Sequence, residues 1–222
     1  MQLDTNQSCK KTTDAGTYIP MKKRILIADD HPMVQKGFKA LFAHYFSNTE
    51  ITEACSCNET MRALMKAEYS HLILDMVLTD GTVLEILPNI VSLYPRSRIM
   101  IFSVQPAGAY QQALRRYGIH YYLSKTSSED DVVRLLGKFL NNESPLAERT
   151  DVQIAANPFS LLTARELEIL HYILKGMGSN QIGDILNIRC NTVSTARTHI
   201  FVKSRTHNIR ELFELATRYN VT

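Results

Sequence analysis

The feature that most constrains the fold is the alternation, between residues 22 and 140, of short apolar runs with longer stretches of helical periodicity. Five runs are predicted to be strands: residues 25–28, 51–54, 72–74, 99–102 and 121–123. They are apolar at successive positions, which is typical of strands that helices cover on both faces. The alternation therefore predicts an α/β domain with a doubly wound, five-stranded parallel sheet.

Five helices are predicted to connect and follow these strands, at residues 32–45, 59–68, 84–93, 109–117 and 129–140. Pro32 suits the first turn of a helix, where its missing N–H costs nothing, and Ser128 suits an N-cap. We interpret Cys55-Ser56-Cys57 as the end of a buried strand. The four cysteines form no disulfide framework, so we expect reduced thiols rather than a metal site.

A second, smaller unit is predicted after a linker at residues 141–158, which contain two prolines and no sustained period. From residue 159 to 222 the segments are all helical, at 164–175, 180–186, 192–203 and 209–218. Thr163 with Glu166, and Asn208 with Glu211, have the spacing of N-terminal capping pairs. A chain of 222 residues also favours two domains over one. Residues 1–21 are polar and unpatterned, and we expect a flexible extension.

The charge is concentrated in the last third of the chain. From Phe159 onward there are eight Lys or Arg residues and five Asp or Glu residues, which accounts for the whole formal net charge of +3. A basic bias of this size is compatible with contact to nucleic-acid phosphates. No apolar run approaches the roughly 18 residues of a membrane span, and residues 1–20 lack a signal-peptide core. We therefore expect a cytoplasmic protein that does not enter a membrane.

Polar side chains follow four of the five predicted strands. Asp29 and Asp30 follow the first, Asp75 the third, Ser103 the fourth and Lys125 the fifth. The carboxyl ends of parallel strands meet at one edge of the sheet, where ligands bind. Three carboxylates at one edge repel each other unless a hard cation lies between them, and oxygen ligands of this kind suit Mg²⁺. The ammonium of Lys125 and the hydroxyl of Ser103 would complete a phosphoryl-binding site.

Residues 22–140 resemble the receiver domain of the NarL/FixJ-type response regulators, which have a flavodoxin-like sheet. The resemblance rests on ILIADDHP (residues 25–32), on DMVLTDGTVLE (residues 75–85) and on the polar residues above. It implies that Asp75 is the phosphoacceptor, and that Mg²⁺ binds Asp29, Asp30, Asp75 and the backbone carbonyl of Val77. It further implies that Ser103 and Tyr122 are the switch residues, beside Lys125.

This chain departs from the family pattern at three positions. Thr79 stands where a proline is usual, Val83 where a glycine is usual, and Tyr121 where a glycine often precedes the switch aromatic. The departures concern loop geometry and remove no chemical group.

The resemblance thus implies phosphorylation of Asp75 by a histidine kinase, with no enzymatic activity beyond Mg²⁺-dependent self-phosphorylation. An aspartate-nucleophile phosphatase would use similar groups. The domain is too short, however, for a substrate cap.

The C-terminal unit resembles a LuxR-type helix-turn-helix, beginning with LTARELEIL at residues 162–170. Val193, Ala196 and Ile200 have helical spacing and are predicted to form its core face. The resemblance implies DNA contacts from the opposite face and from nearby cations. These candidates are Arg189, Thr192, Ser194, Thr195, Arg197, Thr198, Lys203 and Arg205.

The recognition helix also departs from its family. Ser194 and Ala196 stand where lysine and histidine are common, and Ser204-Arg205 replace a usual Leu-Gly. A lost cation weakens DNA binding and its salt dependence without abolishing either. Two hypotheses follow: a phosphorylation-controlled transcription regulator that binds DNA as a homodimer, or a module that has become a protein-interaction or dimerisation unit. The apolar stripe of the last helix would pack partly in the module and partly against a second copy.

Overall fold

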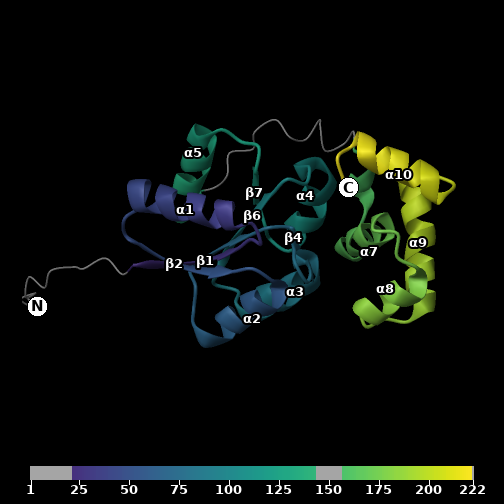
Figure 1. Cartoon of the computed structure of the whole chain (residues 1–222), viewed down its shortest axis with the longest axis horizontal. Coiled ribbons are helices and arrows are strands. Elements are labelled where there is room, and N and C mark those ends of the chain that lie inside the picture. Colours follow the sequence, from purple (N-terminus) through teal and green to yellow (C-terminus); the bar gives the residue numbers. More distant parts are fainter. Residues whose placement is uncertain (1–21, 144–156, 222) are drawn as a thin grey trace, which may run out of the picture.

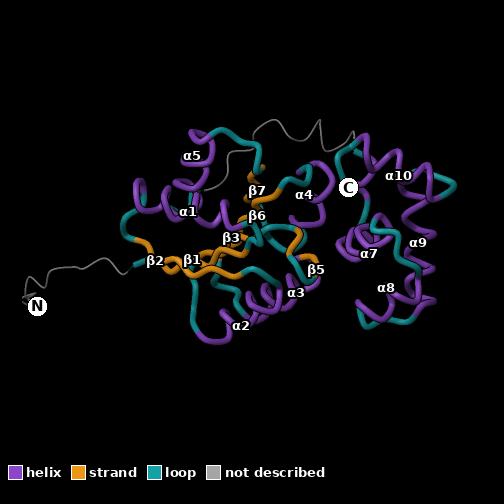
Figure 2. Tube along the Cα trace, viewed as in Figure 1, coloured by secondary structure: helices purple, strands orange, loops and turns teal. Residues whose placement is uncertain are grey.

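The computed structural model describes residues 22–143 and 157–221. The expected extension at residues 1–21 and most of the expected linker lie outside the described residues. The first domain contains five parallel strands in the order β2-β1-β3-β6-β7 (Figures 1 and 2). The strands are β1 (Lys23–Ala28), β2 (Thr49–Ala54), β3 (His71–Leu74), β6 (Arg98–Ser103) and β7 (Tyr121–Ser124). The predicted doubly wound α/β sheet is confirmed.

Helices cover both faces of this sheet. One face carries α1 (Pro32–Tyr45) and α5 (Glu129–Leu140), and the other carries α2 (Cys57–Lys66), α3 (Val83–Leu93) and α4 (Ala107–Arg115) (Figure 1). Phe42 of α1 and Phe139 of α5 are buried on the first side, and Leu87 of α3 is buried on the second. Pro32 occupies the first turn of α1 and Ser128 caps α5, as predicted.

The region around the second strand differs from the prediction. β2 is an edge strand whose side chains are mostly half-buried or exposed, although α1 and α2, which lie on opposite faces of the sheet, both contact it. Cys55-Ser56-Cys57 is not a strand end. The Ser56 hydroxyl accepts a hydrogen bond of 3.0 Å from the Glu59 amide and caps α2, which begins at Cys57. The Asp80 carboxylate also accepts from the Cys57 amide at 2.6 Å, so two side chains satisfy the start of this helix.

A two-stranded hairpin, absent from the sequence prediction, follows the third strand. It consists of β4 (Val77–Leu78) and β5 (Gly81–Thr82), which pair antiparallel. Gly81 has a φ of +154°, and a Cβ there would lie 2.8 Å from Oε1 of Glu85. Strands of two residues are too short to produce a periodic pattern. The hairpin leads directly into α3, and the Val83 amide donates to the Met76 carbonyl at 2.9 Å.

The second domain is helical, as predicted. It contains η1 (Pro158–Leu161), α7 (Ala164–Leu174), α8 (Ser179–Ile185), α9 (Cys190–Ser204) and α10 (Ile209–Arg218). Thr163 and Glu166 form the predicted capping box, and Asn208 caps α10. The short helix η1 was not predicted; the Asn157 side chain caps it by accepting from the Phe159 amide at 2.9 Å. Within residues 22–143 and 157–221, no helix is long and apolar enough to cross a membrane.

The two domains pack against each other through η1 and α7 on one side and α3 and α4 on the other. Buried apolar residues of both domains form one continuous cluster, which includes Leu87 and Tyr110 of the first domain and Phe159 and Leu170 of the second. In Figure 1, α7 lies next to the first domain, and α9 lies on the side of the second domain that is far from the first. The helix predicted to recognise DNA therefore faces away from the first domain.

Candidate functional site

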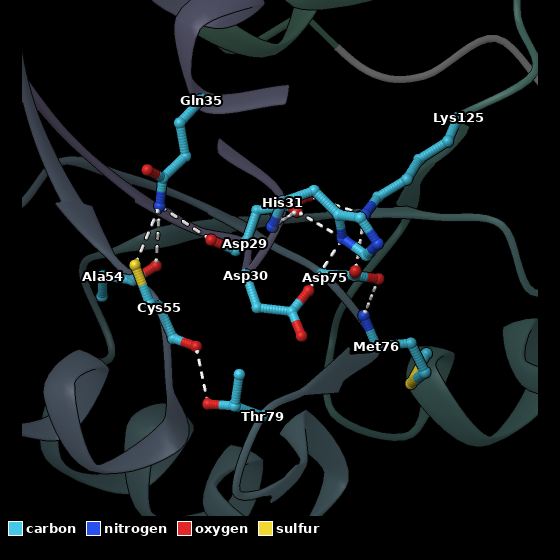
Figure 3. A network of polar contacts seen from close by, with 10 residues as sticks. All are labelled: Asp29, Asp30, His31, Gln35, Ala54, Cys55, Asp75, Met76, Thr79 and Lys125. Carbon is cyan, nitrogen blue, oxygen red and sulfur yellow. Dashed lines mark hydrogen bonds and ion pairs between the residues drawn. The ribbon is translucent and has the colours of Figure 1, made fainter. Parts of the chain in front are cut away.

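The structure brings together the polar residues that follow β1, β3 and β7 (Figure 3). Nζ of Lys125 lies 2.7 Å from Oδ2 of Asp29 and 2.6 Å from Oδ2 of Asp75. Asp29 and Asp75 are 1% and 3% exposed, so the carboxylates sit at the bottom of the site. Parallel strands that end at the same level of the sheet account for this convergence.

Burial and charge act in opposite directions on Asp75. Burial raises the pKa of Asp75, and the hydrogen bonds from Lys125 and Ser103 lower it by less, so its pKa stays above the usual value. Burial alone would lower the pKa of Lys125, but hydrogen bonds to Asp29 and Asp75 raise it above its usual value. Lys125 is therefore a permanent cation beside Asp75. The Met76 amide adds a hydrogen bond of 2.6 Å to Oδ1 of Asp75.

The donor set of this site fits a hard divalent cation. Asp29, Asp30, His31 and Asp75 each offer one ligand atom, and these atoms lie within 4.8 Å of one another. Nζ of Lys125 is the group next to Oδ2 of Asp29, and Nδ1 of His31 is the group next to Oδ1 of Asp30. Three carboxylates this close together repel each other, so a cation between them would stabilise the cluster. Carboxylate oxygens are also the ligands that Mg²⁺ prefers.

His31 belongs to this cluster, and sequence reasoning did not single it out. Its Nδ1 lies 2.7 Å from Oδ1 of Asp30 and 3.2 Å from Oδ1 of Asp29, and its backbone amide donates to Oδ1 of Asp29 at 2.9 Å. The ring itself is largely exposed. Its position directly after the acidic pair in the sequence was the signal that could have identified it.

Ser103 ends β6 and Tyr122 lies on the neighbouring strand β7, and both are close to Asp75. Ser103 is fully buried, and its hydroxyl accepts a hydrogen bond of 3.3 Å from the Gln105 amide. The Tyr122 hydroxyl donates to the Gln105 carbonyl at 2.7 Å, and burial raises its pKa. The Lys125 amide donates to the Ser103 carbonyl at 3.0 Å. The two predicted switch residues and Lys125 are therefore connected through one loop.

Two further side chains hold the loops around the acidic residues (Figure 3). Nε2 of Gln35 donates to the Asp29 carbonyl at 2.7 Å, and the Thr79 hydroxyl donates to the Cys55 carbonyl at 3.1 Å. Thr79, one of the departures from the family pattern, thus links the hairpin to Cys55, the residue that follows β2. Val77 opens β4 two residues after Asp75. A metal-binding role for its carbonyl stays a prediction.

In the helical domain, α9 exposes most of the side chains predicted to contact DNA. Thr192, Ser194, Thr195 and Thr198 are exposed, as are Arg189 before the helix and Arg205 after it. On the opposite side Val193 and Ile200 are fully buried and Ala196 is partly buried, which confirms the predicted core face.

Two of the predicted DNA contacts are placed differently from the expectation. Arg197 lies on the half-buried flank of α9, with its guanidinium carbon 5.6 Å from the centroid of the Phe201 ring. Nζ of Lys203 lies 2.6 Å from Oε2 of Glu166, within the domain. Burial raises the pKa of Glu166, but hydrogen bonds from Lys203 and Thr163 outweigh burial and hold it below the usual value. Lys203 therefore stabilises the capped end of α7.

The last helix divides its apolar residues between two environments. Leu212 and Ala216 are fully buried in the domain, whereas Ile209 and Phe213 are 38% and 37% exposed. Ile209 and Phe213 are four residues apart and share one side of α10. The division matches the expectation that only part of the stripe packs inside the module.

The fold and the site define a signalling receiver joined to a helix-turn-helix. The chain belongs to the response regulators: residues 25–136 match the model of the response regulator receiver domain, and residues 160–216 match that of the bacterial regulatory proteins of the luxR family. The NarL/FixJ-type resemblance is confirmed. A receiver domain followed by a LuxR-type domain is the architecture of a transcription regulator that phosphorylation controls.

Similar proteins cover nearly the whole chain. The oxygen regulatory protein NreC of Staphylococcus carnosus is 27% identical over 215 residues, which span 88% of this chain and 97% of that protein. NreC of Staphylococcus aureus strain MRSA252 is 27% identical over 210 residues, with the same coverage. RcsB of Salmonella enterica serovar Typhimurium, bound to the promoter rprA, has a TM-score of 0.78 at 20% identity, covering 88% of this chain and 98% of that one. That likeness concerns the fold.

Proposed function

We propose that a histidine kinase phosphorylates Asp75, in a reaction that depends on Mg²⁺, and that this phosphorylation controls DNA binding through α9. The observation that carries the proposal is the contact of the Lys125 ammonium with both Asp29 and Asp75, in a buried pocket that Ser103 adjoins. A carboxylate held this way has a fixed orientation, and its neighbours are suited to phosphoryl oxygens.

The reaction transfers one phosphoryl group to Asp75. A carboxylate oxygen of Asp75 attacks the phosphorus, the bond from phosphorus to the donor nitrogen or oxygen breaks, and the donor leaves with that electron pair. The carboxylates of Asp29, Asp30 and Asp75 and the carbonyl of Val77 would hold Mg²⁺, which when bound neutralises charge on the transferring oxygens. Lys125 would exchange part of its contact with the carboxylates for contact with a phosphoryl oxygen.

Phosphorylation would change the surroundings of Ser103 and Tyr122. The new group carries close to two negative charges and strong acceptors, which attract the Ser103 hydroxyl. The loop from Ser103 to Gln105 also holds the Tyr122 hydroxyl, so its movement would reposition Tyr122. Since α4 follows this loop and packs against η1 and α7, the change would reach the helical domain.

The output of this change is binding of a homodimer to DNA. Two modules on half-sites about one helical turn apart bind more tightly than one. Ile209 and Phe213 on α10 are the exposed apolar residues available for contact between copies. The exposed face of α9, with Arg189 and Arg205 at its ends, favours DNA over the interaction-module alternative. We place this activity in the cytoplasm, where a kinase and DNA are both accessible.

Intact-mass measurement tests the phosphoacceptor. The wild type, Asp75→Asn and Asp184→Asn are incubated with acetyl phosphate and Mg²⁺. The wild type and Asp184→Asn, which alters an exposed residue of α8, are expected to gain one phosphate, and Asp75→Asn none. An adduct of equal yield on Asp75→Asn would overturn the assignment.

A further inference from the structure

The outer face of α9 consists of Asn191, Thr195, Thr198 and Val202, which lie opposite the buried Val193 and Ile200. All four are exposed, and Val202 is 70% exposed. In a helix-turn-helix, this is the side of the second helix that enters the major groove. What these four side chains present to a base pair therefore determines which sequence the domain prefers.

The hydroxyls of the two threonines are already engaged within the helix. Oγ1 of Thr195 donates to the Asn191 carbonyl at 3.0 Å, and Oγ1 of Thr198 donates to the Ser194 carbonyl at 3.2 Å. A hydroxyl has a single hydrogen to donate. Each threonine hydroxyl therefore donates its hydrogen within the helix. The γ-methyl is the part of the side chain that takes part in no hydrogen bond.

The outer face carries no lysine or arginine. Within α9 the guanidinium of Arg197 stacks on Phe201 at the half-buried flank, and Lys203 is paired with Glu166. Guanine offers two acceptors in the major groove and is recognised by long cationic donors, whereas thymine offers a methyl group. Methyl groups of threonine and valine at this face match thymine and leave the guanine acceptors without a partner.

We propose that the outer face of α9 recognises thymine methyl groups through the γ-methyls of Thr195 and Thr198 and the side chain of Val202. The preference is for A·T pairs under the centre of the helix, and the inference rests on the proposed binding of DNA. Asn191, at the N-terminal end of the same face, has the side chain that pairs with adenine. Arg189 and Arg205 flank this face and are placed for phosphates.

A thymine scan tests the DNA side of the contact. Tight-binding duplexes are selected from a random library with protein treated with acetyl phosphate and Mg²⁺. Each thymine is then replaced in turn by deoxyuridine, which removes only the C5 methyl. We expect at least one position in each half-site to lose about fourfold in affinity, the effect of burying one methyl pair, and flanking positions to be unaffected.

Matched substitutions test the protein side. Thr198→Ser and Thr195→Ser keep the hydroxyl and remove the methyl, so each should lose affinity about fourfold on the thymine duplex. The same variants should lose nothing further on the deoxyuridine duplex that lacks the partner methyl. Thr198→Val keeps the methyl, removes the hydroxyl and should bind as the wild type does.

Thr217→Ser is the control on α10. Its hydroxyl donates to the Phe213 carbonyl at 2.9 Å, in the same arrangement but on another helix, so its DNA affinity should not change. The proposal is overturned if no deoxyuridine replacement weakens binding, or if Thr198→Val loses affinity while Thr198→Ser does not. A wild type that binds no selected duplex would instead refute DNA binding itself, and the preference with it.

Discussion

The Tyr172 hydroxyl in α7 donates a hydrogen bond of 2.7 Å to Oε1 of Glu85 in α3. The same Glu85 oxygen accepts from the Thr82 amide at 2.9 Å and so belongs to the cap of α3. α3 begins at Val83, whose amide is bound to the carbonyl of Met76, the residue after Asp75. The hydrogen bond between the two domains therefore lies at the N-terminus of α3. The first residue of α3 is in turn bonded to the residue that follows the proposed phosphorylation site.

Tyr172→Phe should loosen this contact without unfolding either domain. A hydrogen bond to a charged acceptor contributes about 1.5–3 kcal/mol, so separation of the domains should become at least tenfold more frequent. Hydrogen exchange of η1 and α4, which pack against each other, measures the opening. Tyr45→Phe, on the opposite side of the first domain, is the control. Unchanged exchange in Tyr172→Phe would show that this bond does not hold the domains together.

Asp30→Ala should weaken Mg²⁺ binding at least tenfold, because it removes one of three carboxylates from the cluster. Isothermal titration calorimetry with MgCl₂ measures the affinity, and Asp184→Ala, on exposed α8, provides a control with the same change of charge. Phosphorylation by acetyl phosphate should fall in parallel. Equal Mg²⁺ affinity in Asp30→Ala and the wild type would contradict the proposed ion site.

His71 should make the protein less stable in mild acid. Burial lowers the pKa of His71 from 6.5 to about 4. Below pH 6.5 the unfolded chain binds a proton that the folded protein binds only near pH 4, so stability falls across that window as the pH decreases. This residue accounts for a loss of about 2 kcal/mol between pH 7.5 and pH 5.

Urea unfolding of the wild type and His71→Leu at these two pH values checks the effect. The variant keeps the apolar packing against Phe139 and lacks the titrating ring. Between pH 7.5 and pH 5, the free energy of unfolding of His71→Leu should decrease by about 2 kcal/mol less than that of the wild type. Equal pH dependence in the two proteins would mean that the pKa of His71 is the same in the folded and the unfolded chain, which would contradict the prediction.

Arg197→Ala should weaken DNA binding evenly across sequences. The guanidinium lies on the flank of α9, beside Phe201, which suits contact with a phosphate better than contact with a base. Fluorescence anisotropy on selected and scrambled duplexes should show similar losses, and the slope of log affinity against log salt should decrease by about one unit. A loss confined to the selected duplex would instead assign Arg197 to a base.

The sequence was sufficient to predict the elements that repeat a pattern. Alternating apolar runs predicted the sheet, and the polar residues at its carboxyl edge predicted the meeting of Asp29, Asp75 and Lys125, because parallel strands bring their ends together. Capping pairs such as Thr163 and Glu166 were also predictable, since they depend on spacing within one helix.

Features that depend on contact between distant segments were not predictable in this way. Lys203 was expected to contact DNA, yet it pairs with Glu166, 37 residues earlier. Asp80 caps α2 from a hairpin of two-residue strands, which leaves no periodic signal. The bond between Tyr172 and Glu85 likewise joins two domains. In each case the partner is set by tertiary packing, which local periodicity does not record.

The central claim is that phosphorylation of Asp75 controls DNA binding, and one comparison tests it directly. Anisotropy titrations of a selected duplex are made with the wild type and Asp75→Asn, each with Mg²⁺ and with or without acetyl phosphate. We predict that acetyl phosphate increases the affinity of the wild type at least tenfold and leaves Asp75→Asn unchanged. An equal response in both proteins, or none in a wild type whose mass shows the phosphate adduct, would contradict the account.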